Sequence, residues 1–125
     1  MNTTNDEKIL ALRAVEGLDV DSGLKNVMNM SAVYVRVLGV FVKNTGKDRK
    51  RFDEYVNTGE LVGFNVMVHG YKSALKSLGA TELSAAAAQL EAAGLNTDTE
   101  FVKANLPSFI DGIEALAEAL EKILD

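Results

Sequence analysis

The chain has 125 residues, 47% of them hydrophobic, with no cysteine, one histidine and a formal net charge of −5. This length suits one domain with a buried core, and the missing cysteine excludes disulfides, a thiolate nucleophile and cysteine-ligated metal sites. The negative charge argues against a nucleic-acid partner, because the phosphate backbone repels it. No apolar run has the length of a membrane span, and residues 1–7 lack the basic and apolar regions of a signal peptide. We therefore expect a cytoplasmic protein without membrane contact.

The first part of the sequence predicts a short helix followed by a linker. Strand signals are scarce and alanine, leucine, glutamate and lysine dominate, which favours an all-α fold. Thr4 and Glu7 have the spacing of a capping box, which would open a helix ending near Val15. Residues 17–23 are rich in turn formers and form the expected linker, with room for one helical turn.

Glycines and capping residues divide the rest of the chain into helices. The predicted ranges are 31–44, 47–57, 60–78, 81–93 and 97–125. Thr97 and Glu100 form a second capping box, and Pro107 inside the last helix predicts a kink. Short connections force neighbouring helices to be antiparallel, so we predict an antiparallel up-down four-helix bundle. One domain would span residues 1–125, with residues 1–16 as an accessory N-terminal helix or segment.

The basic cluster at residues 47–51 has the sequence Lys-Asp-Arg-Lys-Arg. It is short and contains an acidic residue, so a solvated helix start is favoured over a docking patch.

The single histidine, His69, lies outside the predicted buried stripe of its helix. Spacings of three and four define that stripe, which consists of Leu61, Phe64, Val68, Tyr71, Leu75 and Leu78. With about 3.6 residues per turn, His69 points roughly 130° away from the centre of the stripe and should face outward. The alternative is that His69 is a surface or core histidine with no functional role.

The neighbours of His69 are small or apolar, which suits contact with another protein. Val62, Val66 and Ser73 share its side of the helix. The two valines could border a docking patch. Alternatively, they could be exposed incidentally or be buried under the N-terminal helix. Gly70 costs the helix about 1 kcal/mol relative to alanine. Access to the histidine explains this glycine better than close helix packing does.

Two lysines follow His69 on the same helix. Lys72 and Lys76 lie three and seven residues further on, where their ammonium groups could reach a phosphate on the ring. Both could instead be ordinary surface lysines. That alternative is favoured for Lys76, which we assign to the docking surface only, whereas the phosphate contact is favoured for Lys72 by the following resemblance.

This part of the sequence resembles the histidine-containing phosphotransfer (HPt) domain of two-component phosphorelays. The matching residues are His69-Gly70-Tyr71-Lys72-Ser73, Leu78-Gly79-Ala80, Leu83 and Leu90-Glu91, and further upstream Gly17-Leu18-Asp19, Gly23-Leu24, Tyr34, Leu38, Phe41 and Gly59-Glu60-Leu61. The resemblance covers residues 17–125. Ser73 stands where the family usually has glycine, and it is still small enough for a partner to approach.

The resemblance implies a signal-transduction phosphocarrier rather than an enzyme. His69 would accept a phosphoryl group from a receiver-domain aspartate and pass it to another receiver, and a neutral imidazole, with an ordinary pKa of about 6.5, is a competent nucleophile for this. Glu91 matches the position of a partner for the ring, accepting from Nδ1–H so that Nε2 points outward. A carboxylate there also favours the protonated ring, and a solvated charge is the alternative for Glu91. Lys72 would neutralise charge on the phosphoryl group.

The expected partners are receiver domains of response regulators or hybrid histidine kinases, which would supply the Mg²⁺. We expect no cofactor or metal site in the chain itself, because its acidic residues are scattered and one histidine is a poor basis for a site. Without a P-loop it should neither bind ATP nor phosphorylate itself. We expect a monomer, because docking needs a free His69 face. The alternatives are a bundle that docks a receiver without chemistry and, disfavoured by the short length, a catalytic kinase fragment.

Overall fold

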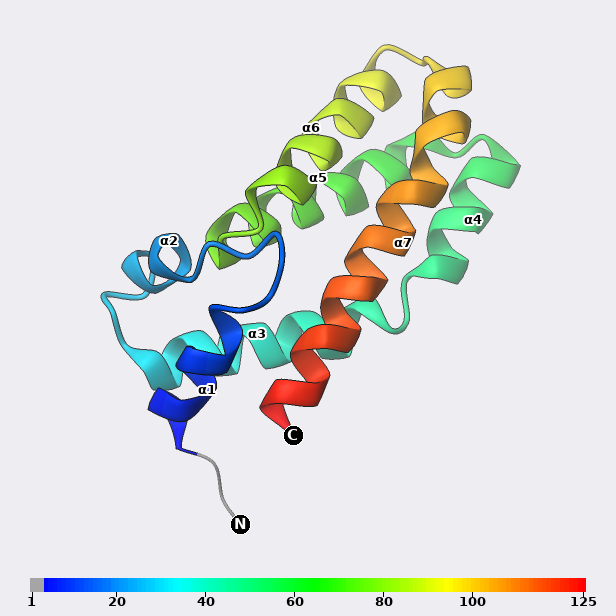
Figure 1. The fold of residues 1–125 in the computed structure, drawn as a ribbon. Helices are drawn as coiled ribbons and strands as arrows, with labels where there is room; N and C mark the ends of the chain where they lie inside the picture. Colours follow the sequence, from blue (N-terminus) through cyan, green and yellow to red (C-terminus); the bar gives the residue numbers. More distant parts are fainter. Residues whose placement is uncertain (1–3) are drawn as a thin grey trace.

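The structure is a computed structural model that describes residues 4–125, and all regular elements in this range are helices, as predicted (Figure 1). The helices are α1 (Asn5–Leu12), α2 (Val20–Lys25), α3 (Ser31–Thr45), α4 (Arg49–Thr58), α5 (Leu61–Leu78), α6 (Thr81–Leu95) and α7 (Thr99–Leu124). None of these helices combines the length and apolar composition that crossing a bilayer requires. Residues 1–3 of the expected accessory segment lie outside the described residues.

Helix α1 begins where the capping box predicted but ends earlier than expected. The Thr4 side chain accepts a hydrogen bond from the Glu7 amide at 3.1 Å. The predicted end near Val15 is wrong, because the helix ends at Leu12. Beyond it the backbone tightens: the amides of Ala14 and Val15 donate to carbonyls three residues back, at 3.1 and 3.0 Å, instead of four.

The capping box predicted from Thr97 and Glu100 is also wrong. Thr97 has a positive φ of 56°, so it belongs to the left-handed turn that ends α6. Asp98 caps α7 instead, and its carboxylate accepts a hydrogen bond from the Phe101 amide at 3.1 Å. From there α7 continues through Pro107 to Leu124, so the proline does not end the helix.

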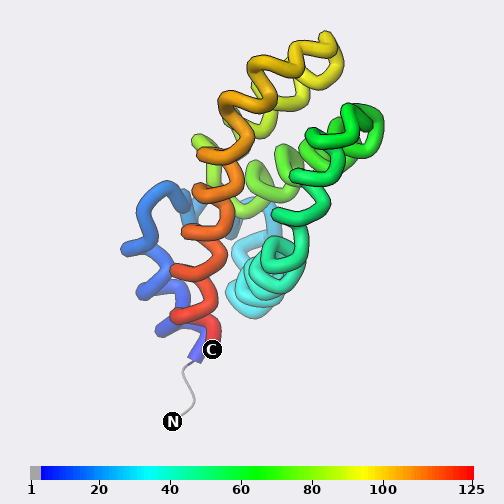
Figure 2. Tube along the Cα trace, turned by 90° about the vertical axis from the view of Figure 1, so that its right-hand side faces the viewer, coloured from blue at the N-terminus to red at the C-terminus, as the bar shows by residue number. Residues whose placement is uncertain are grey.

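Helix α5 contacts α2, α3, α4 and α6. Helix α6 returns along α5 after the turn at Gly79 and Ala80, α7 packs on α6 and α3, and both α3 and α4 contact α5 (Figures 1 and 2). Gly79 has a φ of 94°, and a side chain there would collide with the Asp19 carbonyl. Helix α1 packs on α3 and on α7, beside the C-terminal end of the chain (Figure 2).

An aromatic cluster joins four of these helices in the core. It consists of Phe41 from α3, Phe52 from α4, Phe64 and Tyr71 from α5, and Phe109 from α7. Ring centroids lie 5.7–6.4 Å apart, mostly in edge-to-face geometry, which favours aromatic pairs beyond simple area burial. The cluster therefore fixes how α3 and α4 sit against α5.

Two tyrosine hydroxyls cross from one helix to another at separate points along α5. Tyr34 of α3 donates to the carbonyl of Leu78 at 2.7 Å, and Tyr71 of α5 donates to Oδ2 of Asp48 at 2.6 Å. A Cβ on Gly23 would lie only 2.4 Å from the Tyr34 ring, so α2 packs directly on it. These two bonds set the spacing between α5 and the α3–α4 segment.

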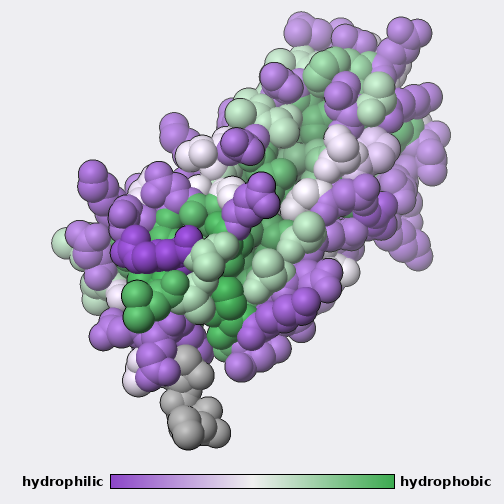
Figure 3. Space-filling model, in the orientation of Figure 1, coloured by the Kyte–Doolittle hydropathy of each residue, from purple (hydrophilic) through white to green (hydrophobic). Residues whose placement is uncertain are grey.

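The face of the molecule drawn in Figure 3 is polar around most of its margin. Apolar residues gather at its lower left, over α1 and the elements next to it, and continue as a band through the middle of the view toward the top, whereas hydrophilic residues cover its right side over α4. Arg49 of α4 pairs with Asp111 at 2.7 Å and with Glu114 at 2.8 Å, both on α7, which ties α4 to α7 through charges.

Replacing Tyr34 by phenylalanine should lower the free energy of unfolding by about 1 kcal/mol at pH 7, because the Leu78 carbonyl loses its donor. Burial, with a smaller effect of Asp19, raises the pKa of Tyr34 to about 12 from 10.0. A raised folded-state pKa means that the stabilisation is present below pH 10 and lost as pH rises toward 12. Urea denaturation of both proteins should therefore show a difference that narrows above pH 10; a difference that widens there would contradict this assignment.

Candidate functional site

The His69 side chain lies on the exposed face of α5, as the helical period predicts. It is 60% exposed, whereas Phe64, Val68, Tyr71 and Leu75 on the opposite face are buried. The ring can therefore be reached from solvent.

A single carboxylate on α6 holds both His69 and Lys72. Nδ1 of His69 lies 2.5 Å from Oε2 of Glu91, and Nζ of Lys72 donates to Oε1 of the same residue at 2.6 Å. The Glu91 side chain is only 15% exposed, because α6 packs closely on α5 at this level. The contact predicted between Glu91 and the ring is present, and the contact of Glu91 with Lys72 is an addition that the sequence did not reveal.

The ionised Glu91 carboxylate gives the two nitrogens of the His69 ring different roles. A hydrogen bond from Lys72 lowers the pKa of Glu91, desolvation opposes this, and His69 lowers it further. The carboxylate is therefore ionised at neutral pH and can only accept hydrogen bonds. Nδ1 must carry the proton that it shares with Glu91, so in the neutral ring Nε2 holds the free lone pair.

Ser84 anchors the backbone of the site from α6 and was missed by the sequence reasoning. Its buried hydroxyl donates to the carbonyl of Lys72 at 2.9 Å. The sequence does contain a signal for it: Ser84 is a polar residue at a position on the buried face of α6, directly before four alanines. The bond fixes α6 against α5 at the turn that carries Lys72.

Gly70 has no packing reason to be a glycine. A Cβ built there meets no atom within 4 Å, which excludes the alternative of close helix packing. Gly94 on α6 is the opposite case, since a Cβ there would lie 1.9 Å from Oδ1 of Asn65. The space beside His69 is therefore open.

The predicted docking residues all lie exposed on α5. Val62 is 74% and Val66 71% exposed, and α1, which contacts α3 and α7, does not cover them. Ser73 and Lys76 are exposed as well. Of the alternatives left open for the valines, burial under the N-terminal helix is thus wrong.

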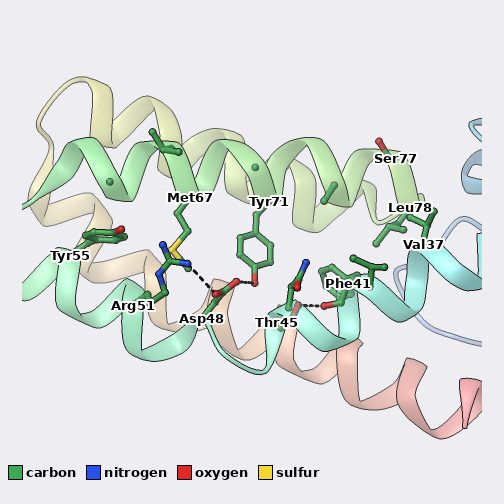
Figure 4. A pocket seen from close by; sticks show the side chains of 16 residues that line it. Val37, Phe41, Thr45, Asp48, Arg51, Tyr55, Met67, Tyr71, Ser77 and Leu78 are labelled. Atoms are coloured by element: carbon green, nitrogen blue, oxygen red, sulfur yellow. Dashed lines mark hydrogen bonds and ion pairs between the residues drawn. The ribbon is translucent and has the colours of Figure 1, made fainter.

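A groove, which we call the α3–α5 groove, runs beside this face with a volume of about 760 Å³ (Figure 4). Its lining residues are Val37, Val40, Phe41, Asn44, Thr45, Asp48, Arg51, Tyr55, Gly63, Val66, Met67, Gly70, Tyr71, Ala74, Ser77 and Leu78. Val66 and Gly70 belong both to this groove and to the predicted docking surface, whereas Val62, Ser73 and Lys76 lie outside it. Sequence reasoning missed the groove because it depends on how α3 and α4 approach α5.

The basic cluster at residues 47–51 is exposed at its cations, as expected for a solvated helix start, but two members have tertiary partners. Arg49 binds Asp111 and Glu114 of α7, and Asp48 accepts from Tyr71 instead of capping α4 with its side chain.

Within residues 4–125, no three or more histidine, aspartate or glutamate side chains lie close enough together to hold a metal ion. No family model, curated protein or solved structure matches this chain. Its functional interpretation therefore depends on the geometry described above.

Replacing Gly70 by alanine should raise the free energy of unfolding by about 1 kcal/mol, because the helix gains propensity and the methyl group meets no neighbour. Gly94→Ala, also within a helix, should destabilise instead, because its methyl would collide with Asn65. Thermal and urea unfolding of the two variants checks this, and a Gly70→Ala protein less stable than the wild type would show that the space is occupied.

Replacing Glu91 by glutamine should destabilise the protein by about 1 kcal/mol at neutral pH, because two charge-assisted hydrogen bonds weaken. Since the folded-state pKa of Glu91 is lowered from 4.5, its contribution is present above pH 4.5 and lost as pH falls through the folded value. The difference between wild type and variant should therefore shrink below pH 4.5 in denaturant titrations. Comparing Glu91 with Glu91→Gln in a His69→Gln background isolates the contribution of the Lys72 contact. If the difference in the free energy of unfolding between wild type and Glu91→Gln stays the same at acid pH, Glu91 is not the ionised acceptor described here.

Proposed function

We propose that this chain is a phosphocarrier of the HPt type, which takes a phosphoryl group onto His69 from a receiver-domain aspartate and gives it to another receiver. One observation carries the proposal: an exposed imidazole has Nδ1 held by Glu91, beside Lys72. The sequence resemblance to that family supports the same reading.

The transfer step follows from the two ring nitrogens. The Nε2 lone pair attacks the phosphorus of the aspartyl phosphate, the N–P bond forms as the P–O bond to the aspartate breaks, and the carboxylate leaves with the bonding electrons. The Nδ1 proton stays hydrogen-bonded to Glu91, whose negative charge offsets the positive charge that the ring acquires. Passing the group to the next receiver reverses these steps. The receiver would supply the Mg²⁺, and the chain itself would be a carrier rather than a kinase.

The position of Lys72 supports a role in stabilising the transferred group. In the structure its ammonium binds Glu91, next to the ring, and its side chain is partly exposed. A phosphoryl group on Nε2 would offer it stronger acceptors, since phosphate oxygens bind cations well. We expect Lys72 to contact both Glu91 and the phosphoryl group, and so to be more ordered after transfer.

The proposed fold for this function is an antiparallel up-down four-helix bundle. Segment α3–α4 would serve as its first rod, followed by α5, α6 and α7, and residues 1–16 would be the accessory segment. Contacts of α5 with α6, α6 with α7, α7 with α3, and α3 and α4 with α5 support this arrangement. We further propose that the protein is a cytoplasmic monomer whose partners are receivers of response regulators or hybrid histidine kinases.

The test is transfer from a receiver phosphorylated with labelled phosphate. Wild type should gain acid-labile label, and His69→Gln should gain none. Lys72→Ala should slow transfer by about 10- to 100-fold, through lost charge stabilisation, whereas Lys103→Ala, which removes an equal charge from the exposed surface of α7, should stay within about twofold. Glu91→Ala should also slow transfer, and a wild-type rate would remove Glu91 from the mechanism.

Two outcomes would overturn the proposal. A receiver that binds the wild type without transferring label would favour a docking bundle without chemistry. Label that appears with ATP and Mg²⁺ alone would indicate kinase activity of the chain itself.

A further inference from the structure

The α3–α5 groove has the size and lining of a small-molecule site. Its volume of about 760 Å³ lies within the range of roughly 300–1,000 Å³ that is typical of ligand pockets. Along most of its length the walls are apolar, formed by Val37, Val40 and Phe41 from α3 and by Val66 and Met67 from α5. Val40 and Val66 are largely exposed, so the groove leaves apolar surface in water that a ligand would cover.

The α4 end of the groove is polar and carries a cation. Arg51 and Tyr55 lie side by side there, with Asp48 further in (Figure 4). Nη1 of Arg51 is 4.0 Å from Oδ1 of Asp48, a loose contact, while the other oxygen of Asp48 is engaged by Tyr71. A guanidinium has five N–H donors, and the Arg51 side chain is largely exposed. The guanidinium already faces the Tyr55 hydroxyl and the carboxylates of Asp48 and Glu54. The donors that these neighbours leave free are available to an anion.

The groove is held open by bonds already described. The Tyr34 hydroxyl fixes α3 to the Leu78 end, and the Tyr71 hydroxyl fixes the α3–α4 connection at Asp48. The rings of Phe41 and Tyr71 pack against each other with centroids 6.4 Å apart. The walls of the groove are therefore preorganised, and binding a ligand would cost little free energy for ordering them.

We propose that the α3–α5 groove binds a small amphipathic carboxylate, with an apolar chain or ring along Val37, Phe41 and Met67 and its carboxylate on Arg51. The apolar walls exclude a highly charged ligand. Arg51 is the one cation among the lining residues, and the neighbouring Asp48 carboxylate already accepts from Tyr71, so the guanidinium is the group that can take one anionic head.

Binding would also affect the site on α5. Val66 and Gly70 line the groove and flank His69 in the sequence, so a bound molecule would cover one side of the docking surface. This consequence rests on the proposed function: occupancy of the groove should slow phosphoryl transfer from a receiver. Binding itself does not depend on that function, so the two can fail separately.

The first experiment titrates octanoate into the full chain and follows valine and methionine methyl resonances by NMR. We expect saturable shifts at Val37, Val66 and Met67 with a dissociation constant on the order of 1 mM, given the ligand's size. Uncharged 1-octanol should bind more weakly. Arg51→Gln should weaken octanoate binding about tenfold and leave octanol unchanged, whereas Lys50→Gln, an equal charge change outside the groove, should alter neither.

The second experiment blocks the groove. Ala74 lines it and is exposed, so Ala74→Trp should fill the space without disturbing the core, and Ala74→Ser serves as the size control. Tryptophan should abolish octanoate shifts while circular dichroism shows an unchanged fold, and serine should not. No saturable shift in the wild type, equal affinity for octanoate and octanol, or undiminished binding in Ala74→Trp would each overturn the proposal.

The transfer assay separates the two ideas. Octanoate that binds the groove should slow labelling of His69 in the wild type, and this inhibition should disappear in Arg51→Gln at the same concentration. A groove that binds octanoate in a chain that never accepts phosphate would leave the ligand site standing and refute only the phosphocarrier proposal.

Discussion

The carboxylate of Glu91 is the one group on which the geometry of the site depends. It accepts from the His69 ring with one oxygen and from the Lys72 ammonium with the other. Both donors come from α5 and the acceptor comes from α6, so the bridge exists only because these two helices pack side by side. An ionised acceptor that is largely enclosed by protein fixes the ring's tautomer and holds the cation on the same carboxylate as the ring. Removing it would leave two donors on one helix with no common partner.

The two faces of α5 contribute differently to stability: one packs in the core, and the other carries residues that do not stabilise the helix. Its buried face contributes Phe64 and Tyr71 to the aromatic cluster that joins four helices. Its outer face carries a glycine in open space and two exposed valines, neither of which favours an isolated stable domain. Departures from local stability rules that gather around one reactive side chain are typical of functional sites. Here they lie on both sides of His69.

The tyrosine bonds connect the core to the surface. Each hydroxyl leaves a buried ring and reaches a partner beside the α3–α5 groove, which gives the groove fixed walls. Asp48 accepts from Tyr71 and does not cap α4, so a local stabilising contact is exchanged for a tertiary one. The groove and the His69 face share Val66 and Gly70, and whatever occupies one will affect access to the other.

Local periodicity in the sequence determined the helices and the outward direction of His69, because side-chain direction along a helix repeats every few residues. It failed at Thr97 and after Leu12, where the backbone near a chain reversal decides which residue caps or ends the helix. Glu91 was placed by resemblance alone, since no spacing rule links it to His69 across 22 positions. The bonds of Tyr71 with Asp48 and of Arg49 with Glu114, and the groove itself, were decided only by tertiary structure. They join residues 23 and 65 positions apart, and such contacts depend on how whole helices pack.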